Sequence, residues 1–395
     1  MIDGELIRSM DESRITEYMR IKDSLTVLPL QRFISYVSRH TILSAPIRVE
    51  ISLTNACNQY CFHCSNARRT GHSHVQEFKT NWLKQIISCS PILCILTGGE
   101  PTLHNNFADV VRMLKDAGII VTILSNGTTW DTKSVRFLLE SGFSNNDRVQ
   151  ISLDAATPSR YFDCRRTDDY HKVLDTIFML SDAGIAVDVH CVPTVHTIEC
   201  VKDIYSIANN RGAHSFSTAP VVPLGRASIS DFPSIEQLID VEIDLIRLST
   251  CYNTKYLGSL LGTNCSYMHL IDCEVDENVK VAQKPDKYRC EAGMSSAYID
   301  ENGDVYTCVY ASEHPFTPLG NLSKNSFLDI WSNSRNDPSR IGVSVIGSLC
   351  AQCEHWGICS GGCFGVSSIN SGKIQMGHDT RCKKIMEDLH CERKK

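Results

Sequence analysis

The sequence predicts an α/β protein, a partial (β/α)6 TIM-like barrel followed by a small cysteine-rich domain. Two observations lead to this fold class. From about residue 47 to 250, short apolar and β-branched runs alternate with stretches of helical period, which is typical of parallel strands joined by crossover helices. Closely spaced cysteines then follow towards the carboxyl terminus, in a density that the packing of a core does not require.

Six apolar runs account for the strands of the predicted barrel. They are 47–53, 92–97, 119–124, 149–153, 186–192 and 214–219, and the clearest helical stretches between them are 106–117, 131–141 and 171–183. In barrels of this kind the reactive groups lie on loops at the carboxyl ends of the strands. Every unusual segment of this chain follows a predicted strand, so we expect these segments to gather at one end of the barrel.

The segment after the first strand carries cysteines in the spacing CxxxCxxC, at Cys57, Cys61 and Cys64. A four-iron cluster binds four ligands, so a loop with three thiolates leaves one iron open for another molecule. The alternative is a zinc site, because CxxC pairs are common zinc ligands. A zinc ion would need a fourth ligand, for which His63 or His72 is available.

Short polar and glycine-containing segments follow the next three strands. Gly98 and Gly99 allow a close approach of the backbone to a ligand, and the Glu100 carboxylate can receive an ammonium group. Ser125, Asn126, Ser152 and Asp154 come at the ends of the third and fourth strands. Each segment alone could be a plain turn or a helix cap. Their order along the chain is the stronger signal.

In this order, the segments resemble the radical S-adenosylmethionine (SAM) superfamily. The resemblance implies that the open iron chelates S-adenosyl-L-methionine and that an electron splits it, giving a 5′-deoxyadenosyl radical that removes hydrogen from a substrate. It also implies contacts of Gly98, Gly99 and Glu100 with the methionine amino end of SAM, and of Ser125, Asn126 and Ser152 with ribose hydroxyls. The segment from Ser152 through Asp154 to Arg165 is similar to a family segment in which the arginine meets the SAM carboxylate.

The carboxyl-terminal cysteines resemble the seven-cysteine SPASM signature, which implies two auxiliary 4Fe-4S clusters and hence three in the chain. By this resemblance, one auxiliary cluster takes Cys290, Cys308 and Cys363, and the other takes Cys350, Cys353, Cys359 and Cys382. An eighth ligand is Cys273 or Cys265, or else one auxiliary iron is open and binds substrate. The alternative for these cysteines is structural zinc.

The predicted domain organisation has four parts. They are an amino-terminal helical lead at 1–46, the barrel at 47–227, a bridging segment at 228–280 with a helix at 234–249, and the SPASM domain at 281–395. A β-hairpin is predicted over 297–306, because Asn302-Gly303 between alternating runs is a strong turn signal.

The composition indicates a reduced, cytoplasmic enzyme. The chain has 395 residues, of which 42% are hydrophobic and 21% charged, as is ordinary for globular proteins. Its amino terminus lacks the features of a signal peptide, and no apolar run is long enough to span a membrane. A net charge of −6 argues against a nucleic-acid partner, since phosphate binding depends on clustered basic residues.

The resemblance implies hydrogen abstraction from a peptide or protein carbon, with an electron donor such as flavodoxin or ferredoxin. The 46 residues before the first strand are too few for a winged-helix module that grips a leader peptide, so a separate leader-binding protein is a possible partner. One alternative is oxidation, dehydration or epimerisation of a small molecule such as a sugar or aminocyclitol. Another is an iron-sulfur scaffold or electron carrier that does not cleave SAM.

The sequence leaves the catalytic base open. His190 lies at the end of the fifth strand and His196 beyond it, and either could be structural, a core histidine or a loop residue. Asp188 faces the same side as His190 or the opposite side, depending on the strand register. Arg226, in a GRA segment frequent in SPASM enzymes, could reach SAM, a substrate carboxylate or a surface ion-pair partner.

Overall fold

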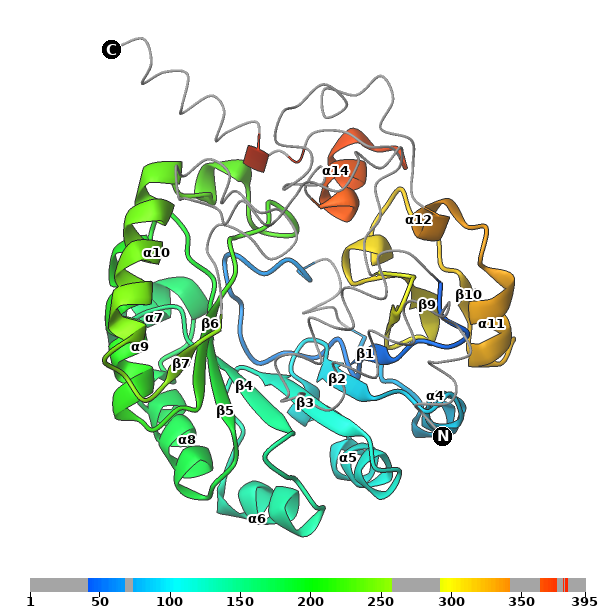
Figure 1. Ribbon diagram of the computed structural model, residues 1–395, viewed down its shortest axis with the longest axis horizontal. Coiled ribbons are helices and arrows are strands. Elements are labelled where there is room, and N and C mark those ends of the chain that lie inside the picture. Colours follow the sequence, from blue (N-terminus) through cyan, green and yellow to red (C-terminus); the bar gives the residue numbers. More distant parts are fainter. Residues whose placement is uncertain are drawn as a thin grey trace, which may run out of the picture.

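Figure 1 shows a computed structural model of the chain, which describes residues 42–67, 74–257, 292–341, 363–374, 379 and 381–382. In these residues, one sheet has the strand order β10-β9-β8-β1-β2-β3-β4-β5-β6-β7. The strands are β1 (Arg48–Ser52), β2 (Leu93–Thr97), β3 (Ile120–Ser125), β4 (Arg148–Ser152), β5 (Val187–Cys191), β6 (Ser215–Thr218), β7 (Lys255–Tyr256), β8 (Ser296–Ile299), β9 (Asp304–Tyr306) and β10 (Gly320–Asn321).

The predicted partial barrel is confirmed. Strands β1 to β6 are all parallel and lie side by side in chain order. The crossover helices are α4 (Leu83–Ser88), α5 (Phe107–Asp116), α6 (Thr132–Glu140), α7 (Pro158–Arg165), α8 (Tyr170–Asp182) and α9 (Val201–Asn210), followed by α10 (Ile235–Ser249). In Figure 1 the sheet is strongly curved, and α5, α6, α8, α9 and α10 lie outside the curve.

Helix α7 was not among the predicted helices. Its sequence is mostly polar and gives only a weak apolar stripe, so the periodicity that identifies the other helices is absent. A start signal is nevertheless present, because Thr157 accepts a hydrogen bond from the Arg160 backbone and Pro158 occupies the first turn.

Alternate residues of each barrel strand pack against the outer helices and form the core. They include Val49, Ile51, Cys94, Leu96, Val121, Ile123, Val149, Ile151, Val189 and Cys191, all fully buried. Cys94 and Cys191 therefore fill the core as small apolar side chains, as the sequence predicts. The other residues of each strand face the inside of the curve, where polar side chains predominate on β4, β5 and β6.

The chain from Ala292 to Ile341 extends the barrel sheet at its β1 edge. Strand β8 pairs with β1 in parallel and with β9 in antiparallel, so the predicted hairpin is confirmed. A Cβ at Gly303, in its turn, would lie 2.7 Å from the Trp82 ring, and φ there is +81°. Trp331 of α11 (Phe327–Asn333) joins the same core as the barrel and donates to the Leu43 carbonyl at 2.8 Å.

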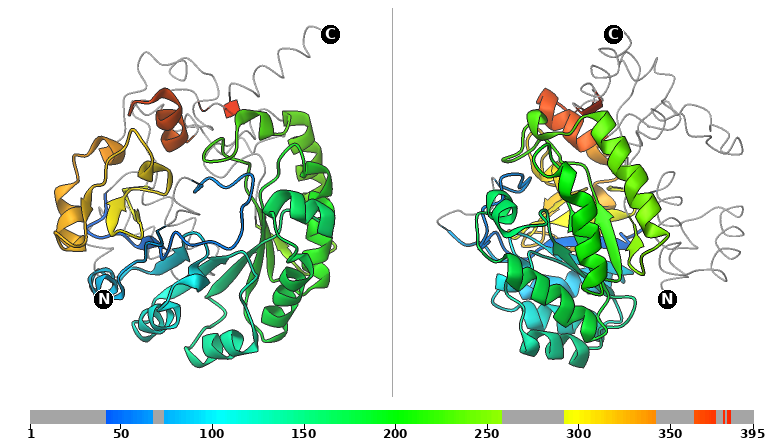
Figure 2. Two further views of the ribbon diagram at one scale, coloured as in Figure 1. Left: turned by 180° about the vertical axis from the view of Figure 1, so that it is seen from behind. Right: turned by 90° about the vertical axis from the view of Figure 1, so that its left-hand side faces the viewer.

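Two short helices, α12 (Pro338–Ile341) and α14 (Phe364–Ser371), complete the described carboxyl-terminal part. Both panels of Figure 2 place α14 at the open side of the curved sheet, away from the helices around β3 and β4. The predicted boundary between residues 280 and 281 and the predicted helical lead before residue 42 lie outside the described residues. Of the helices in the described ranges, none is both long and apolar enough to cross a bilayer.

Candidate active site

The loop after β1 carries Cys57, Cys61 and Cys64, and Figure 1 shows it crossing the inside of the curved sheet. On the β2 side it rests against the predicted glycine pair. Gly99 donates its backbone N–H to the Thr54 carbonyl at 2.7 Å, and Glu100 donates to the Ala56 carbonyl at 2.8 Å. A Cβ at Gly99 would lie 2.2 Å from the Ala56 oxygen, so the glycine permits close contact with the cysteine loop itself.

On the β6 side the same loop rests against Gly225 and Arg226. A Cβ at Gly225, where φ is +66°, would lie 2.2 Å from the Cys64 carbonyl oxygen. Arg226 donates from its backbone to the Cys64 carbonyl at 3.1 Å and from Nε to the Cys61 carbonyl at 2.7 Å. Its guanidinium also lies 3.8 Å from the centre of the Tyr60 ring. The GRA segment therefore holds the cysteine loop, a contact that the sequence does not predict.

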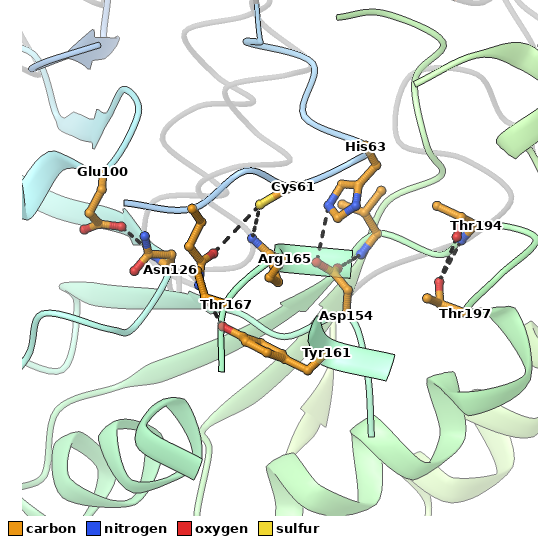
Figure 3. Close-up of polar contacts among 12 residues, drawn as sticks. Cys61, His63, Glu100, Asn126, Asp154, Tyr161, Arg165, Thr167, Thr194 and Thr197 are labelled. Carbon is orange, nitrogen blue, oxygen red and sulfur yellow. Dashed lines mark hydrogen bonds and ion pairs between the residues drawn. The ribbon is translucent and has the colours of Figure 1, made fainter. Parts of the chain in front are cut away.

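The carboxyl end of α7 contacts the middle of the cysteine loop (Figure 3). Tyr60 donates its backbone N–H to the Arg165 carbonyl at 3.2 Å, and Phe62 donates to the Cys164 carbonyl at 3.1 Å. The Arg165 side chain donates to the sulfur of Cys61 at 3.4 Å. A guanidinium at this place stabilises negative charge on the sulfur, which is the charge that a metal-bound thiolate carries.

Asp154, directly after β4, binds the other end of the Arg165 guanidinium and is almost fully buried. The same carboxylate lies 3.3 Å from Nε2 of His63 and accepts the Val192 backbone N–H at 2.7 Å. Burial alone would raise the pKa of Asp154, but Arg165 and His63 lower it well below its ordinary value. Asp154 is therefore a carboxylate that joins β4, β5, α7 and the cysteine loop.

Glu100 forms a second buried carboxylate centre, between β2 and β3. Its oxygens accept from the Thr102 hydroxyl at 2.6 Å, the Ser125 hydroxyl at 2.9 Å and the Asn126 backbone at 2.7 Å. Burial is the largest effect on Glu100 and raises its pKa, while these hydrogen bonds oppose the shift. The structure thus brings the predicted SAM contacts Glu100, Ser125 and Asn126 together.

Replacement of Glu100 with glutamine is expected to destabilise this end of the barrel by about 1–3 kcal/mol. The new amide hydrogens would face groups that already donate, because Glu100 accepts from both Thr102 and Ser125. Urea unfolding under anaerobic conditions measures the free energy of unfolding. Glu140→Gln, at an exposed carboxylate on α6, is the matched control and should change it little. Equal stabilities of the two variants would contradict the role of this network.

Two of the predicted ribose contacts are occupied by hydrogen bonds within the protein. The Ser125 hydroxyl receives the Trp130 indole N–H at 2.9 Å and donates to Glu100. The Asn126 amide donates to the Asn58 side chain at 2.7 Å, which ties β3 to the cysteine loop. Ser152, by contrast, lies partly exposed at the inner end of β4. Asn58 was missed as a site residue, although it directly follows the first motif cysteine.

The structure settles the register question on β5. Val189 and Cys191 face the helices, so Asp188 and His190 share the inner face of the sheet. His190 is paired in register with Ser152 of β4 and lies within hydrogen-bond distance of Ser217. His196 is separate from this group: its side chain is 64% exposed and lies 3.7 Å from Asp231.

The chemistry of the cysteine loop fits an iron-sulfur cluster better than a zinc ion. Among the described residues, no three Cys, His, Asp or Glu side chains converge on a point where one metal ion could bind. In a four-iron cluster each thiolate binds a different iron, so the sulfurs stand further apart than around zinc. His63 turns its Nε2 to Asp154. Burial raises the pKa of Cys57 to about 11, so iron binding would release a proton there.

Of the carboxyl-terminal motif cysteines, the structure describes Cys308, Cys363 and Cys382. Tyr310 lies near both Cys308 and Cys363: burial first, and then these thiols, raise its pKa. Cys363 also donates its backbone N–H to Asp379 at 3.2 Å, and Asp379 pairs with Arg381 at 2.7 Å. The remaining predicted ligands lie outside the described residues; they are Cys265, Cys273, Cys290, Cys350, Cys353 and Cys359.

Comparisons with known proteins agree with this geometry. Mycofactocin maturase MftC of Mycobacterium tuberculosis is 26% identical over 364 residues, which cover 90% of this chain and 86% of that protein. The AdoMet-dependent heme synthase of Methanosarcina barkeri is 23% identical and covers 80% of this chain and 91% of that protein. The crystal structure of Streptococcus suis SuiB bound to precursor peptide SuiA has a TM-score of 0.69 at 20% identity, covering 90% of this chain and 81% of that chain. That likeness shows a shared fold.

Two family models match separate parts of the chain. Residues 51–208 match the radical SAM superfamily, and residues 290–354 match the SPASM iron-sulfur cluster-binding domain. The first match begins within β1 and ends within α9, so it covers the end of β1, the cysteine loop and strands β2 to β5. The chain therefore belongs to the radical SAM superfamily and carries a SPASM domain.

Proposed function

We propose that this chain is a peptide-modifying radical SAM enzyme. When bound, a reduced cluster and SAM supply a 5′-deoxyadenosyl radical that takes a hydrogen atom from a peptidyl carbon. The observation that carries the proposal is the CxxxCxxC loop, which is held on three sides at the carboxyl ends of the strands by Gly99, Gly225 and Arg165. MftC is named a maturase, and SuiB was solved with its precursor peptide, which supports a peptide substrate.

The residues of the site divide into those that hold the cluster and those that hold SAM. Cys57, Cys61 and Cys64 would be the cluster ligands, with the Arg165 guanidinium stabilising the charge on Cys61. SAM would lie between the Glu100 centre and the Asp154–Arg165 pair. Unused polar atoms point to a ligand here, because Nε of Arg165 and Nδ1 of His63 are buried without a hydrogen-bond partner among the described residues.

We further propose three 4Fe-4S clusters, of which two are held by the SPASM cysteines. Tyr310, near both Cys308 and Cys363, supports placing these two thiols on the same auxiliary cluster. The electron donor would be a flavodoxin or ferredoxin. A separate leader-binding protein would present the peptide. Iron and sulfide analysis after anaerobic reconstitution tests the cluster count: about twelve irons per chain would support three clusters, and about eight would remove one auxiliary site.

The test of function is anaerobic incubation of the reduced, reconstituted protein with SAM, followed by chromatography for 5′-deoxyadenosine. We expect the wild-type protein to form it and Cys61→Ser to lose at least about 100-fold in rate, since a displaced reactive group costs this much. Cys251→Ser, at an exposed cysteine outside the motifs, is the control and should keep the rate. If the wild-type protein formed no 5′-deoxyadenosine, the result would favour the alternative of an iron-sulfur scaffold or electron carrier that does not cleave SAM.

The substrate class is tested separately, by adding a synthetic copy of a precursor peptide encoded beside the gene and recording its mass. A loss or gain of hydrogen that depends on SAM would support peptide modification. The similarity to the AdoMet-dependent heme synthase is the reason to test the small-molecule alternative. The match to that protein covers less of this chain than the match to the maturase. An unchanged peptide together with a modified small molecule would favour that alternative.

A further inference from the structure

The inner face of β4, β5 and β6 carries a polar network that includes none of the three cysteines of the loop. Its centre is Asp188 on β5, which is 5% exposed. The carboxylate accepts hydrogen bonds from the Gln150 amide at 2.8 Å, the Ser215 hydroxyl at 2.9 Å and the Ser217 hydroxyl at 2.6 Å. Three hydrogen-bond donors on β4 and β6 therefore fix the position of the Asp188 carboxylate, which is the acceptor in each bond.

The network fixes the tautomer of His190. A serine hydroxyl has one hydrogen, and Ser217 donates it to Asp188 because an ionised carboxylate can only accept. The oxygen of Ser217 must therefore accept from Nδ1 of His190, which lies 2.9 Å away. With the hydrogen on Nδ1, a neutral imidazole presents a basic lone pair at Nε2.

His190 faces charged groups from each element packed around it. They are Asp188 on its own strand, Asp154 after β4, Arg165 of α7 and His63 of the cysteine loop. Burial is the largest effect and lowers the pKa of His190, while Asp188 and Asp154 oppose the shift. The imidazole is therefore neutral near pH 7. It is only partly buried, and no described residue forms a hydrogen bond with its Nε2.

His190 lies where a side chain could contact the substrate. The residue lies near the carboxyl end of β5, in register with Ser152 of β4, and its carbonyl accepts the Leu153 N–H at 2.9 Å. The next residue of β4's loop is Asp154, which pairs with Arg165 beside Cys61. His190 therefore lies on the inner face of the barrel, on the strand next to the one that leads to Asp154 and the place proposed for SAM.

We propose that His190 is a catalytic residue whose Nε2 accepts a proton from the substrate. This inference rests on the proposed function. Once a hydrogen atom has left the reacting carbon, the nitrogen, oxygen or sulfur atom bonded to that carbon gives its proton to His190. Its N–H, O–H or S–H bond breaks, and an Nε2–H bond forms. The electron pair of the broken bond stays on the substrate, and the step consumes no oxidant. Asp188 and Ser217 are positioning residues that stabilise the resulting imidazolium through Nδ1–H.

The first test compares His190→Asn with the wild type in the precursor-peptide assay described above. Asparagine keeps a short donor towards Ser217 and lacks Nε2. We expect the rate of peptide modification to fall by about 100-fold relative to the rate of 5′-deoxyadenosine formation, the usual contribution of a general base. His171→Asn, at an exposed histidine on α8, should change neither rate. Unchanged peptide modification in His190→Asn would overturn the proposal.

A second variant keeps the proposal testable if His190→Asn also loses SAM cleavage. Asp188→Asn removes the negative charge that raises the pKa of His190, so the acid limb of the pH profile for peptide modification should move to lower pH. A purely structural role would lower the rate without moving the limb, and an unmoved limb would overturn the proposal. Failure of the proposed function is distinguishable, because the wild type itself would then form no 5′-deoxyadenosine.

Discussion

Gly225→Ala is expected to lose about 100-fold or more of the rate of 5′-deoxyadenosine formation, together with iron at the cysteine loop. The added Cβ would lie 2.2 Å from the Cys64 carbonyl oxygen and 2.7 Å from that of Ser65, and both are backbone atoms that cannot rotate away. The cysteine loop or the GRA segment must therefore shift, and a displacement near 1 Å at a reacting group costs about 100-fold. The measurements are iron content and the SAM-cleavage rate under reducing, anaerobic conditions.

The control separates the clash from the backbone conformation. Gly142 also has a left-handed φ, +81°, and a Cβ there would meet nothing within 4 Å. Gly142→Ala should therefore show only the strain of an alanine in this region, about 1–2 kcal/mol, with normal iron content and SAM cleavage. If Gly225→Ala behaved like Gly142→Ala, the contact between the GRA segment and Cys64 would have no part in holding the loop.

Asp154→Ala is expected to lower the free energy of unfolding by about 3–5 kcal/mol, because it leaves the Arg165 guanidinium buried without its partner. The two side chains are 1% and 8% exposed, so water cannot replace the lost contact. The change also removes the acceptor of the Val192 backbone N–H. Urea unfolding of the protein under anaerobic conditions measures the change in the free energy of unfolding. SAM binding should also weaken in this variant, because Asp154 no longer orients the Arg165 side chain.

An exposed pair of the same residue types provides the comparison. Asp175 and Arg211 lie 3.3 Å apart with side chains 76% and 34% exposed, so Asp175→Ala should change the free energy of unfolding by less than about 1 kcal/mol. The pH dependence has a definite sign. Folding lowers the pKa of Asp154, so its contribution is present above the unfolded pKa of about 4 and is lost as the pH falls through the folded pKa. Similar losses in the two alanine variants would contradict a structural role for the buried pair.

The sequence predicted the parts of the fold that depend on local patterns. The six strands could be recognised because their apolar, β-branched runs are short and are bounded by turn residues. The hairpin around Gly303 was predicted from a two-residue turn signal. Helix α7 was missed because its polar sequence has no apolar period, although Thr157-Pro158 marks its start. It is the helix that brings Arg165 to Cys61.

The predicted loops of the site do meet, and several of their residues also hold the cysteine loop. Gly98 and Gly99 lie against Thr54 and Ala56 of that loop, and their contact with SAM stays a prediction. Arg226 was considered for SAM, a substrate or a surface pair, and it binds the loop carbonyl of Cys61. The spacing of residues along the chain could not reveal these contacts, because they join residues that are far apart in the sequence. Cys61 and Arg226, for example, are 165 positions apart.

The sequence by itself determined the chemistry that this protein has available: three thiols on one loop, polar groups at successive strand ends, and a family whose members use SAM. Such information is local, since a motif needs only the correct residues at the correct spacing. Only the tertiary structure decided which polar groups form hydrogen bonds within the protein and which remain able to bind a ligand. Ser125 and Asn126 turn out to be hydrogen-bonded within the protein, whereas Nε2 of His190 has no hydrogen-bond partner in the part of the chain that the structure describes. The physical reason is that a hydrogen bond depends on which donor folding brings within about 3 Å, and parallel strands bring distant parts of the chain together at one edge.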